Sequence, residues 1–142
     1  MAPAERYASQ RIAEILDKSR LGIIAGTGHL PRQIAERFDP SGKTIFFIAL
    51  EGITDPETVI NFDHKWAKLG QLQIAMTALL DAKVDKVVMA GPVKRPALSS
   101  LKLDKRASKM LLRGGVKVFG DDGLLSLLIN EIEKDGLKVI GI

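Results

Sequence analysis

The stretch Val84-Asp85-Lys86-Val87-Val88-Met89-Ala90-Gly91-Pro92-Val93-Lys94-Arg95-Pro96 decides the fold, because an apolar β-type run ends there in a Gly-Pro turn that carries two cations. Two other places repeat this design: Leu21–Ala25 precedes a loop at residues 26–31, and Val116–Phe119 precedes a loop at residues 120–123. Short, wholly apolar runs are typical of strands that are covered on both faces. The sequence therefore predicts buried strands that each end in a glycine-containing loop.

Strand and helix patterns alternate along the rest of the chain. Apolar runs predict strands over residues 21–25, 44–50, 86–90, 116–119 and 137–142. Apolar stripes at helical spacing predict helices over residues 4–18, 31–38, 66–82, 105–112 and 122–134, with Phe38, Leu80 and Leu125 facing inward. Residues 57–64 are left as an irregular link or a short strand. The alternation predicts an α/β, Rossmann-like three-layer domain with a mostly parallel sheet of about five strands.

Length and composition limit the class of protein. At 142 residues the chain is long enough for one domain with its own core, which we place at residues 21–142 after a helical extension over residues 1–20. The absence of cysteine excludes disulfides and thiolate metal sites, and it is compatible with a reducing cytoplasm. The first 20 residues have no continuous apolar core, so they resemble neither a secretory signal nor a membrane span.

The positive charge is concentrated in one segment. The net charge is +4, but residues 94–117 hold eight cations against Asp104 alone, which gives that segment +7 and leaves the remainder at −3. Such a segment attracts phosphates, an anionic lipid surface or nucleic acid, although a solvated face fits the composition equally well. Nucleic acid is the weakest of these interpretations, because the segment has no aromatic side chain to stack on a base.

The loops that follow parallel strands open on one edge of the sheet, where ligands of open α/β sheets bind. Gly26-Thr27-Gly28 begins like a dinucleotide fingerprint, with Glu51 as the ribose-binding acid, but the third glycine is replaced by Pro31. The remaining turn could present backbone N–H groups and a helix N-terminus to an anion. The alternative is that the glycines only permit a tight turn.

Two charged pairs also follow predicted strands. Lys94 and Arg95 lie between Pro92 and Pro96, and two cations held by such a stiff loop suit a pyrophosphate clamp. Asp121-Asp122 opens a predicted helix, where one carboxylate is expected as the N-cap and the other gains from the helix dipole. The functional alternative for this acidic pair is a ligand contact or a hard cation such as Mg²⁺.

Other reactive residue types give weaker signals. His29 is a loop residue that either forms local hydrogen bonds or contacts ligand, whereas His64 is predicted to be structural. Trp66 is predicted to pack at the start of a helix. No nucleophile and base stand at a recognisable spacing, since none of the serines has a histidine partner; the serines considered are Ser99, Ser100 and Ser108.

Five segments, in this order, carry a family resemblance: Ile24-Ala25-Gly26-x-Gly28-x-Leu30-Pro31, Gly52-x-Thr54-Asp55-Pro56, Gly70-Gln71-Leu72, Val87-Val88-Met89-Ala90-Gly91-x-Val93-x-Arg95-Pro96 and Gly120-Asp121-Asp122-x-Leu124-Leu125. Together they resemble the N-terminal domain of the metal-dependent UDP-2,3-diacylglucosamine pyrophosphatases of lipid A synthesis. The resemblance covers roughly residues 21–142 and leaves residues 1–20 without a function.

The resemblance implies a hydrolase that splits a lipidated UDP-sugar into UMP and an acylated sugar phosphate. It implies a cytoplasmic enzyme at the inner face of the inner membrane, with a divalent metal, Mg or Mn, bound mainly by a C-terminal domain. That domain is absent from this sequence, so we expect a truncated domain that binds substrate, lacks the catalytic residues and is inactive alone. Its expected partners are the substrate, the acylated sugar phosphate, its own C-terminal domain, a peripheral membrane contact and a second copy in a homodimer, but no nucleic acid.

The predicted substrate-binding residues follow three of the predicted strands: Gly26, Thr27, Gly28, Lys94, Arg95, Asp121 and Asp122. Two alternatives stay open at this point. One is a stand-alone nucleotide or phosphate-ligand binding module, and the other is an NAD-dependent oxidoreductase.

Overall fold

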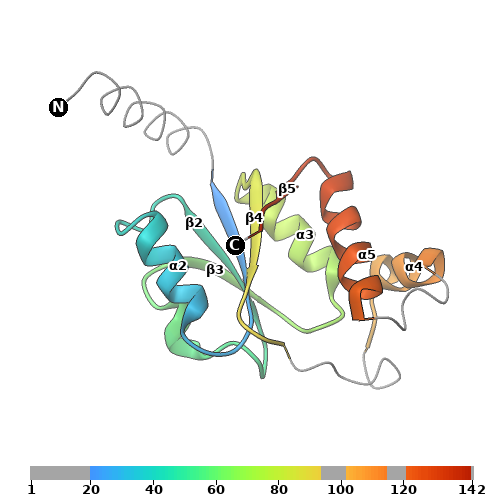
Figure 1. Cartoon of the computed structure of the whole chain (residues 1–142), viewed down its shortest axis with the longest axis horizontal. Coiled ribbons are helices and arrows are strands. Elements are labelled where there is room, and N and C mark those ends of the chain that lie inside the picture. The colour runs from blue at the N-terminus through green and yellow to red at the C-terminus, as the bar shows by residue number, and fades with distance from the viewer. Residues whose placement is uncertain (1–19, 94–101, 115–120, 142) are drawn as a thin grey trace.

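The structure is a computed structural model that describes residues 20–93, 102–114 and 121–141, without the side chains of Asp121 and Asp122. Strands and helices alternate along the described chain (Figure 1). The elements are β1 (Leu21–Ala25), α2 (Leu30–Phe38), β2 (Ile45–Leu50), the 3₁₀ helix η1 (Pro56–Val59), β3 (Asp63–Ala67), α3 (Leu72–Asp81), β4 (Lys86–Ala90), α4 (Lys105–Gly114), α5 (Asp121–Lys134) and β5 (Lys138–Val139).

The strands form one sheet in the order β3-β2-β1-β4-β5, and all its neighbouring pairs are parallel. In the register, Ile23 of β1 lies between Phe47 of β2 and Val88 of β4. This is the strand order of doubly wound α/β domains, in which the chain turns in opposite directions from a central strand. The predicted three-layer α/β class with five strands is therefore confirmed.

Each face of the sheet has its own apolar core. Ile23 and Phe47 belong to the core beneath α2 and η1, where Ala35 and Val59 are buried. Phe46, Ile48 and Val87 point to the other face and pack with residues of α3 and α5; the contributors from these helices include Met76, Leu79 and Ile132. Residues that neighbour each other in a strand face opposite sides, so wholly apolar strands are what a sheet covered on both faces requires.

Helix α4 lies outside these three layers. It packs against α3 and α5, with Ala107 and Met110 buried (Figure 1). The prediction that Ala107 and Met110 face inward is confirmed, although the neighbours they face are helices. The exposed side of α4 borders a groove that residues of α3 and α5 also line.

The predicted helix over residues 66–82 begins too early. Residues 63–67 form β3, and α3 begins only at Leu72. Gly70 has a φ of +102°, a left-handed conformation that cannot continue a right-handed helix. Trp66 nevertheless packs against the core beneath α2, so its packing role is confirmed in a strand instead of a helix.

Several other predictions differ in detail. β5 contains two residues, where six were predicted. Phe38, Leu80 and Leu125 are 37%, 43% and 46% exposed although their spacing predicted an inward face; Phe38 and Leu80 lie in the last turns of their helices, and Leu125 is the fifth residue of α5. The predicted helix over residues 4–18 and the predicted strand over residues 116–119 lie outside the described residues.

Candidate functional site

The loops after β1 and β4 are joined by backbone hydrogen bonds. The N–H of Gly26 donates to the carbonyl oxygen of Ala90 at 2.7 Å, and the N–H of Thr27 donates to the carbonyl oxygen of Pro92 at 2.9 Å. The Thr27 hydroxyl also donates to the Pro92 carbonyl, at 3.0 Å. Strand pairing thus continues past the ends of both strands, at the point where the strand order reverses direction.

Two glycines permit this close approach. A Cβ atom on Gly26 would lie 2.3 Å from the carbonyl oxygen of Gly91, and one on Gly91 would lie 2.6 Å from the carbonyl oxygen of Thr27. Both contacts are with backbone, which cannot move aside as a flexible side chain can. The glycine at the end of each strand is therefore explained by the contact between the two loops.

The loop after β2 joins the same edge through Thr54 and Asp55. The buried Thr54 hydroxyl donates to the carbonyl oxygen of Ala25 and accepts the N–H of Leu50, both at 2.7 Å. Asp55 Oδ2 accepts the N–H of Gly28 at 3.3 Å. Three loops from three neighbouring strands thus form one connected surface at the carboxyl edge of the sheet, which is where ligands of open α/β sheets bind.

These hydrogen bonds change what the glycine loop can offer an anion. The N–H groups of Gly26, Thr27 and Gly28 all have acceptors within the described chain, which favours the alternative that the glycines permit a tight turn. The acceptors are the carbonyl oxygens of Ala90, which ends β4, and of Pro92 in the following loop, together with the Asp55 carboxylate. These three N–H groups are therefore not free to donate to a dinucleotide pyrophosphate, which does not favour the NAD-dependent alternative.

The structure places the other predicted site residues only in part. Lys94 and Arg95 lie outside the described residues, directly after the segment that Thr27 holds. Helix α5 begins at Asp121, as the acidic pair predicted, although the side chains of Asp121 and Asp122 are not described. Because β4 and β5 are parallel, α5 runs against them and its first turn lies at the carboxyl edge. Ligand contact by these four residues stays a prediction.

Asp104 is a residue of this edge that the sequence analysis missed. Its Oδ1 accepts the N–H of Ala107 at 2.8 Å in the first turn of α4, and its Oδ2 accepts the N–H of Gln73 at 2.6 Å in the first turn of α3. One carboxylate thus caps two helix N-termini, where a negative charge is favourable. The position of Asp104 just before a helical pattern indicates that it caps α4. Its bond to the first turn of α3 depends on tertiary structure and has no signal in the local sequence.

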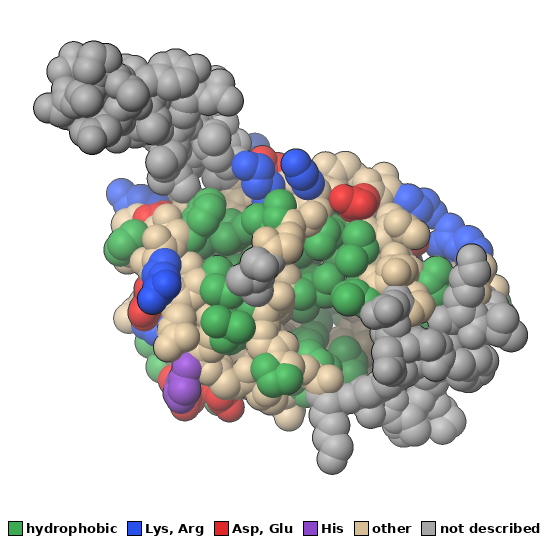
Figure 2. All heavy atoms as spheres, in the orientation of Figure 1, with side chains coloured by type: hydrophobic (Ala, Val, Ile, Leu, Met, Phe, Trp, Pro, Cys, Tyr) green, Lys and Arg blue, Asp and Glu red, His purple; other side chains and the backbone are tan. Residues whose placement is uncertain are grey.

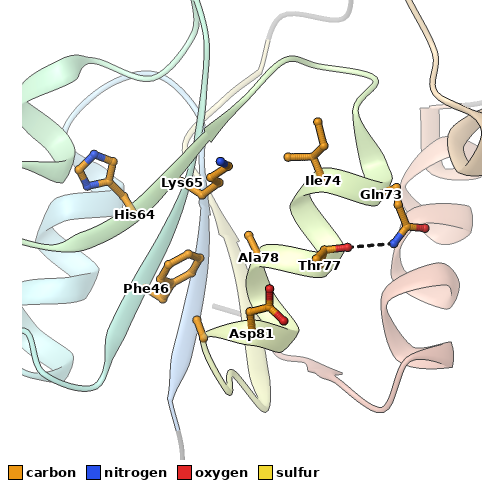
Figure 3. Close-up of a pocket in the computed structure, with 9 residues that line it drawn as sticks. Phe46, His64, Lys65, Gln73, Ile74, Thr77, Ala78 and Asp81 are labelled. Atoms are coloured by element: carbon orange, nitrogen blue, oxygen red, sulfur yellow. Dashed lines mark hydrogen bonds between the residues drawn. The ribbon is translucent and has the colours of Figure 1, made fainter.

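A separate groove of about 560 Å³ lies between β3 and α3 (Figure 3). Lys65 of β3 and Ile74 and Asp81 of α3 are among the residues that line it. Figure 3 shows the Lys65 side chain on the α3 side of β3 and the His64 ring on the other side. This groove contains none of the predicted site residues, so the carboxyl edge remains the candidate site.

The two histidines differ in their described surroundings. His29 is the exposed N-cap residue of α2 and makes no side-chain capping bond. His64 Nδ1 lies 2.8 Å from the carbonyl oxygen of Phe62, and its ring meets Trp66 edge-on. In the described residues, no three His, Asp or Glu side chains gather closely enough to hold a metal ion. Nor does the described part of the chain contain a helix long and apolar enough to cross a bilayer.

The strand order and the three joined loops define the class of protein: a doubly wound α/β domain with a continuous surface at its carboxyl edge. Within that class, the chain belongs to the LpxI N-terminal domain family, whose model matches residues 20–142. It is 32% identical over 123 residues to the UDP-2,3-diacylglucosamine pyrophosphatase LpxI of Caulobacter vibrioides. That match covers 86% of this chain and 44% of the relative, so the chain matches less than half of the relative's length.

Proposed function

We propose that this chain is the substrate-binding N-terminal domain of a pyrophosphatase that hydrolyses UDP-2,3-diacylglucosamine to UMP and 2,3-diacylglucosamine 1-phosphate. The observation that carries the proposal is the family match, which extends over the whole described fold. The joined loops at the carboxyl edge support it, because they offer a fixed surface where this fold class binds ligands.

In this proposal the cations after β4 hold the substrate's pyrophosphate. Lys94 and Arg95 follow a segment whose Pro92 carbonyl accepts two hydrogen bonds from Thr27. A stiff base limits the conformational entropy that a cationic side chain loses when it binds phosphate. Gly26, Thr27 and Gly28 then act by shaping this base, and Asp121 and Asp122 contact the polar part of the ligand from the first turn of α5.

Bond cleavage is assigned to the part of the enzyme that this chain does not match. A divalent metal, Mg or Mn, is proposed to be bound mainly there, and we derive no metal-dependent step from the described residues. We accordingly expect the 142-residue chain to bind substrate and to release UMP far more slowly than a two-domain protein does. UMP release at comparable rates would contradict this division of roles.

The same proposal includes a cellular location and partners for the enzyme. A substrate with two acyl chains resides in a bilayer, so a peripheral membrane contact is part of the proposal, together with a cytoplasmic enzyme at the inner face of the inner membrane. A second domain of the same protein is the first expected partner, and a second copy in a homodimer is another.

Paired substitutions test the pyrophosphate clamp. Lys94→Ala with Arg95→Ala, made in the two-domain protein, should weaken binding of 2,3-diacylglucosamine 1-phosphate by roughly 10- to 100-fold, because charge-assisted bonds to phosphate are lost. The matched control is Lys43→Ala with Lys138→Ala, which removes two exposed cations from the amino ends of β2 and β5. Unchanged affinity in the clamp variant, measured by calorimetry, would leave Lys94 and Arg95 without a role in binding.

A further inference from the structure

Helix α4 presents a cationic outer face. Four of its ten residues are cations and none is acidic: Lys105, Arg106, Lys109 and Arg113. Lys105, Lys109 and Leu112 are exposed, and their spacing puts them on one side of the helix, opposite the buried Ala107 and Met110. We define the α4 face as Lys102, Lys105, Lys109, Leu112 and Arg113.

Among the described residues, carboxylates of α5 and the turn after it neutralise only part of this charge. Glu131 accepts hydrogen bonds from Arg106 and Arg113, and Asp135 pairs with Arg106 at 2.8 Å. In the described residues, no ion pair engages Lys102, Lys105 or Lys109. Figure 2 shows Lys and Arg side chains at the upper right of the molecule, on the side where α4 and α5 lie in Figure 1.

Leu112 stands among these cations and is 82% exposed, more than any other large hydrophobic residue in the described chain. A single exposed leucine is ordinary on a protein surface. A leucine that projects from a helix between lysines, however, is the arrangement of interfacial helices, whose cations bind anionic headgroups while an apolar side chain enters the acyl boundary. An acidic protein segment would match the lysines but would gain less from Leu112.

We propose that the α4 face binds the surface of an anionic lipid bilayer. This inference rests on the proposed function, which requires contact with a bilayer. It identifies the surface of the domain that makes this contact. Helix α4 starts beside Asp104, whose carboxylate also accepts the Gln73 N–H at the start of α3. The start of the α4 face therefore adjoins the carboxyl edge, so a bilayer bound by this face would lie near that edge.

Vesicle binding tests the assignment without any turnover. The unmodified chain should sediment with vesicles of phosphatidylethanolamine and phosphatidylglycerol, should not sediment with vesicles of phosphatidylcholine alone, and should be released by salt. Lys105→Ala with Lys109→Ala should weaken binding roughly 10- to 30-fold, while Lys43→Ala with Lys138→Ala should change it by less than about threefold.

A tryptophan at position 112 reports insertion directly. In the variant Trp66→Phe with Leu112→Trp, the only tryptophan lies on the α4 face, and its emission should shift to shorter wavelength with the anionic vesicles. The proposal would be overturned if the unmodified chain did not sediment with the anionic vesicles, or if both double-lysine variants lost vesicle binding to the same extent. Binding to polyglutamate but not to vesicles would also overturn it. Because substrate binding in detergent is measured separately, failure here would not be confused with failure of the proposed function.

Discussion

Gly26 and Gly91 control the contact between the loops after β1 and β4, since a Cβ on either would meet backbone at less than 3 Å. Sequence analysis predicted both glycines to lie at the carboxyl edge but not that they face each other. Their loops belong to strands separated by more than 60 residues in the chain. The spacing of residues within one loop therefore cannot predict the contact between Gly26 and Gly91.

Gly26→Ala tests the joined loops. The added methyl group would lie 2.3 Å from the Gly91 carbonyl oxygen, so the backbone must shift and the bond to Ala90 must weaken. We expect the free energy of unfolding to fall by about 2–3 kcal/mol in urea denaturation. Gly141→Ala is the control, because a Cβ there meets nothing within 4 Å. Equal stability of the two variants would show that the loops can separate freely.

Asp39 stabilises the turn between α2 and β2. Its carboxylate accepts hydrogen bonds from the backbone N–H and the hydroxyl of both Ser41 and Thr44. Partial burial raises the pKa of this carboxyl, but the hydrogen bonds outweigh that effect and lower the pKa from 3.8 to about 2. The folded state therefore prefers the ionised form more strongly than the unfolded chain does.

Asp39→Asn should reveal this preference as a pH dependence of stability. A depressed pKa contributes stability that is present above the unfolded value of 3.8 and is lost as the pH falls toward 2. Near neutral pH the variant should be about 1–2 kcal/mol less stable than the parent, and this difference should shrink between about pH 4 and pH 2. Asp81→Asn, at the exposed end of α3, should show no such trend in the same urea titrations.

At the scale of elements, a buried ionic network holds α4 against α5. Glu131 is 5% exposed and accepts from Arg106 at 3.1 Å and from Arg113 at 3.0 Å. Burial alone would lower the pKa of Arg106, but hydrogen bonds to Asp135 and Glu131 raise it above its ordinary value. The network fixes the helix that begins with the predicted ligand residues Asp121 and Asp122.

Glu131→Gln should therefore loosen α4. The amide cannot neutralise both guanidinium groups, so we expect a loss of about 2–4 kcal/mol in the free energy of unfolding. Lys134→Gln is the matched control, because that ammonium group is half exposed and 3.8 Å from the Glu131 carboxylate. Its effect should stay below about 0.5 kcal/mol. Both variants are measured by urea denaturation. A similar loss of unfolding free energy in both would show that the buried Glu131 carboxylate contributes no more than the exposed Lys134 ammonium group.

Element boundaries were predicted best where strands are buried. Strands 21–25 and 86–90 were predicted with the observed ends because, apart from Lys86, their residues are apolar and both faces of the sheet carry an apolar core. β3 was missed because it is an edge strand, and its sequence Asp-His-Lys-Trp-Ala has too few apolar residues to show a strand pattern. Its pairing with β2 makes it a strand, and local sequence does not encode that pairing.

At the scale of the whole molecule, the α/β class and the shared carboxyl edge could be predicted because alternating elements allow few arrangements. The hydrogen-bonded loops could not, since Thr54, Asp55 and Asp104 act through partners that are distant in sequence. Because of such contacts, the N–H groups of Gly26, Thr27 and Gly28 donate to other parts of the chain. The site residues after β4 and at the start of α5 remain predictions from the sequence.

The central claim is that the carboxyl edge of this domain binds the lipidated UDP-sugar without cleaving it. The most direct test is an NMR titration of the 142-residue chain with UDP-2,3-diacylglucosamine in detergent micelles, with UMP release followed in the same sample. We predict shifts at the amides of Gly26, Thr27, Gly28 and Gly91, little change at the amino-edge amides of Lys43 and Asp85, and no appreciable UMP. Chemical-shift changes confined to the amino edge, or to the groove between β3 and α3, would contradict binding at the carboxyl edge. Rapid UMP release would contradict binding without cleavage.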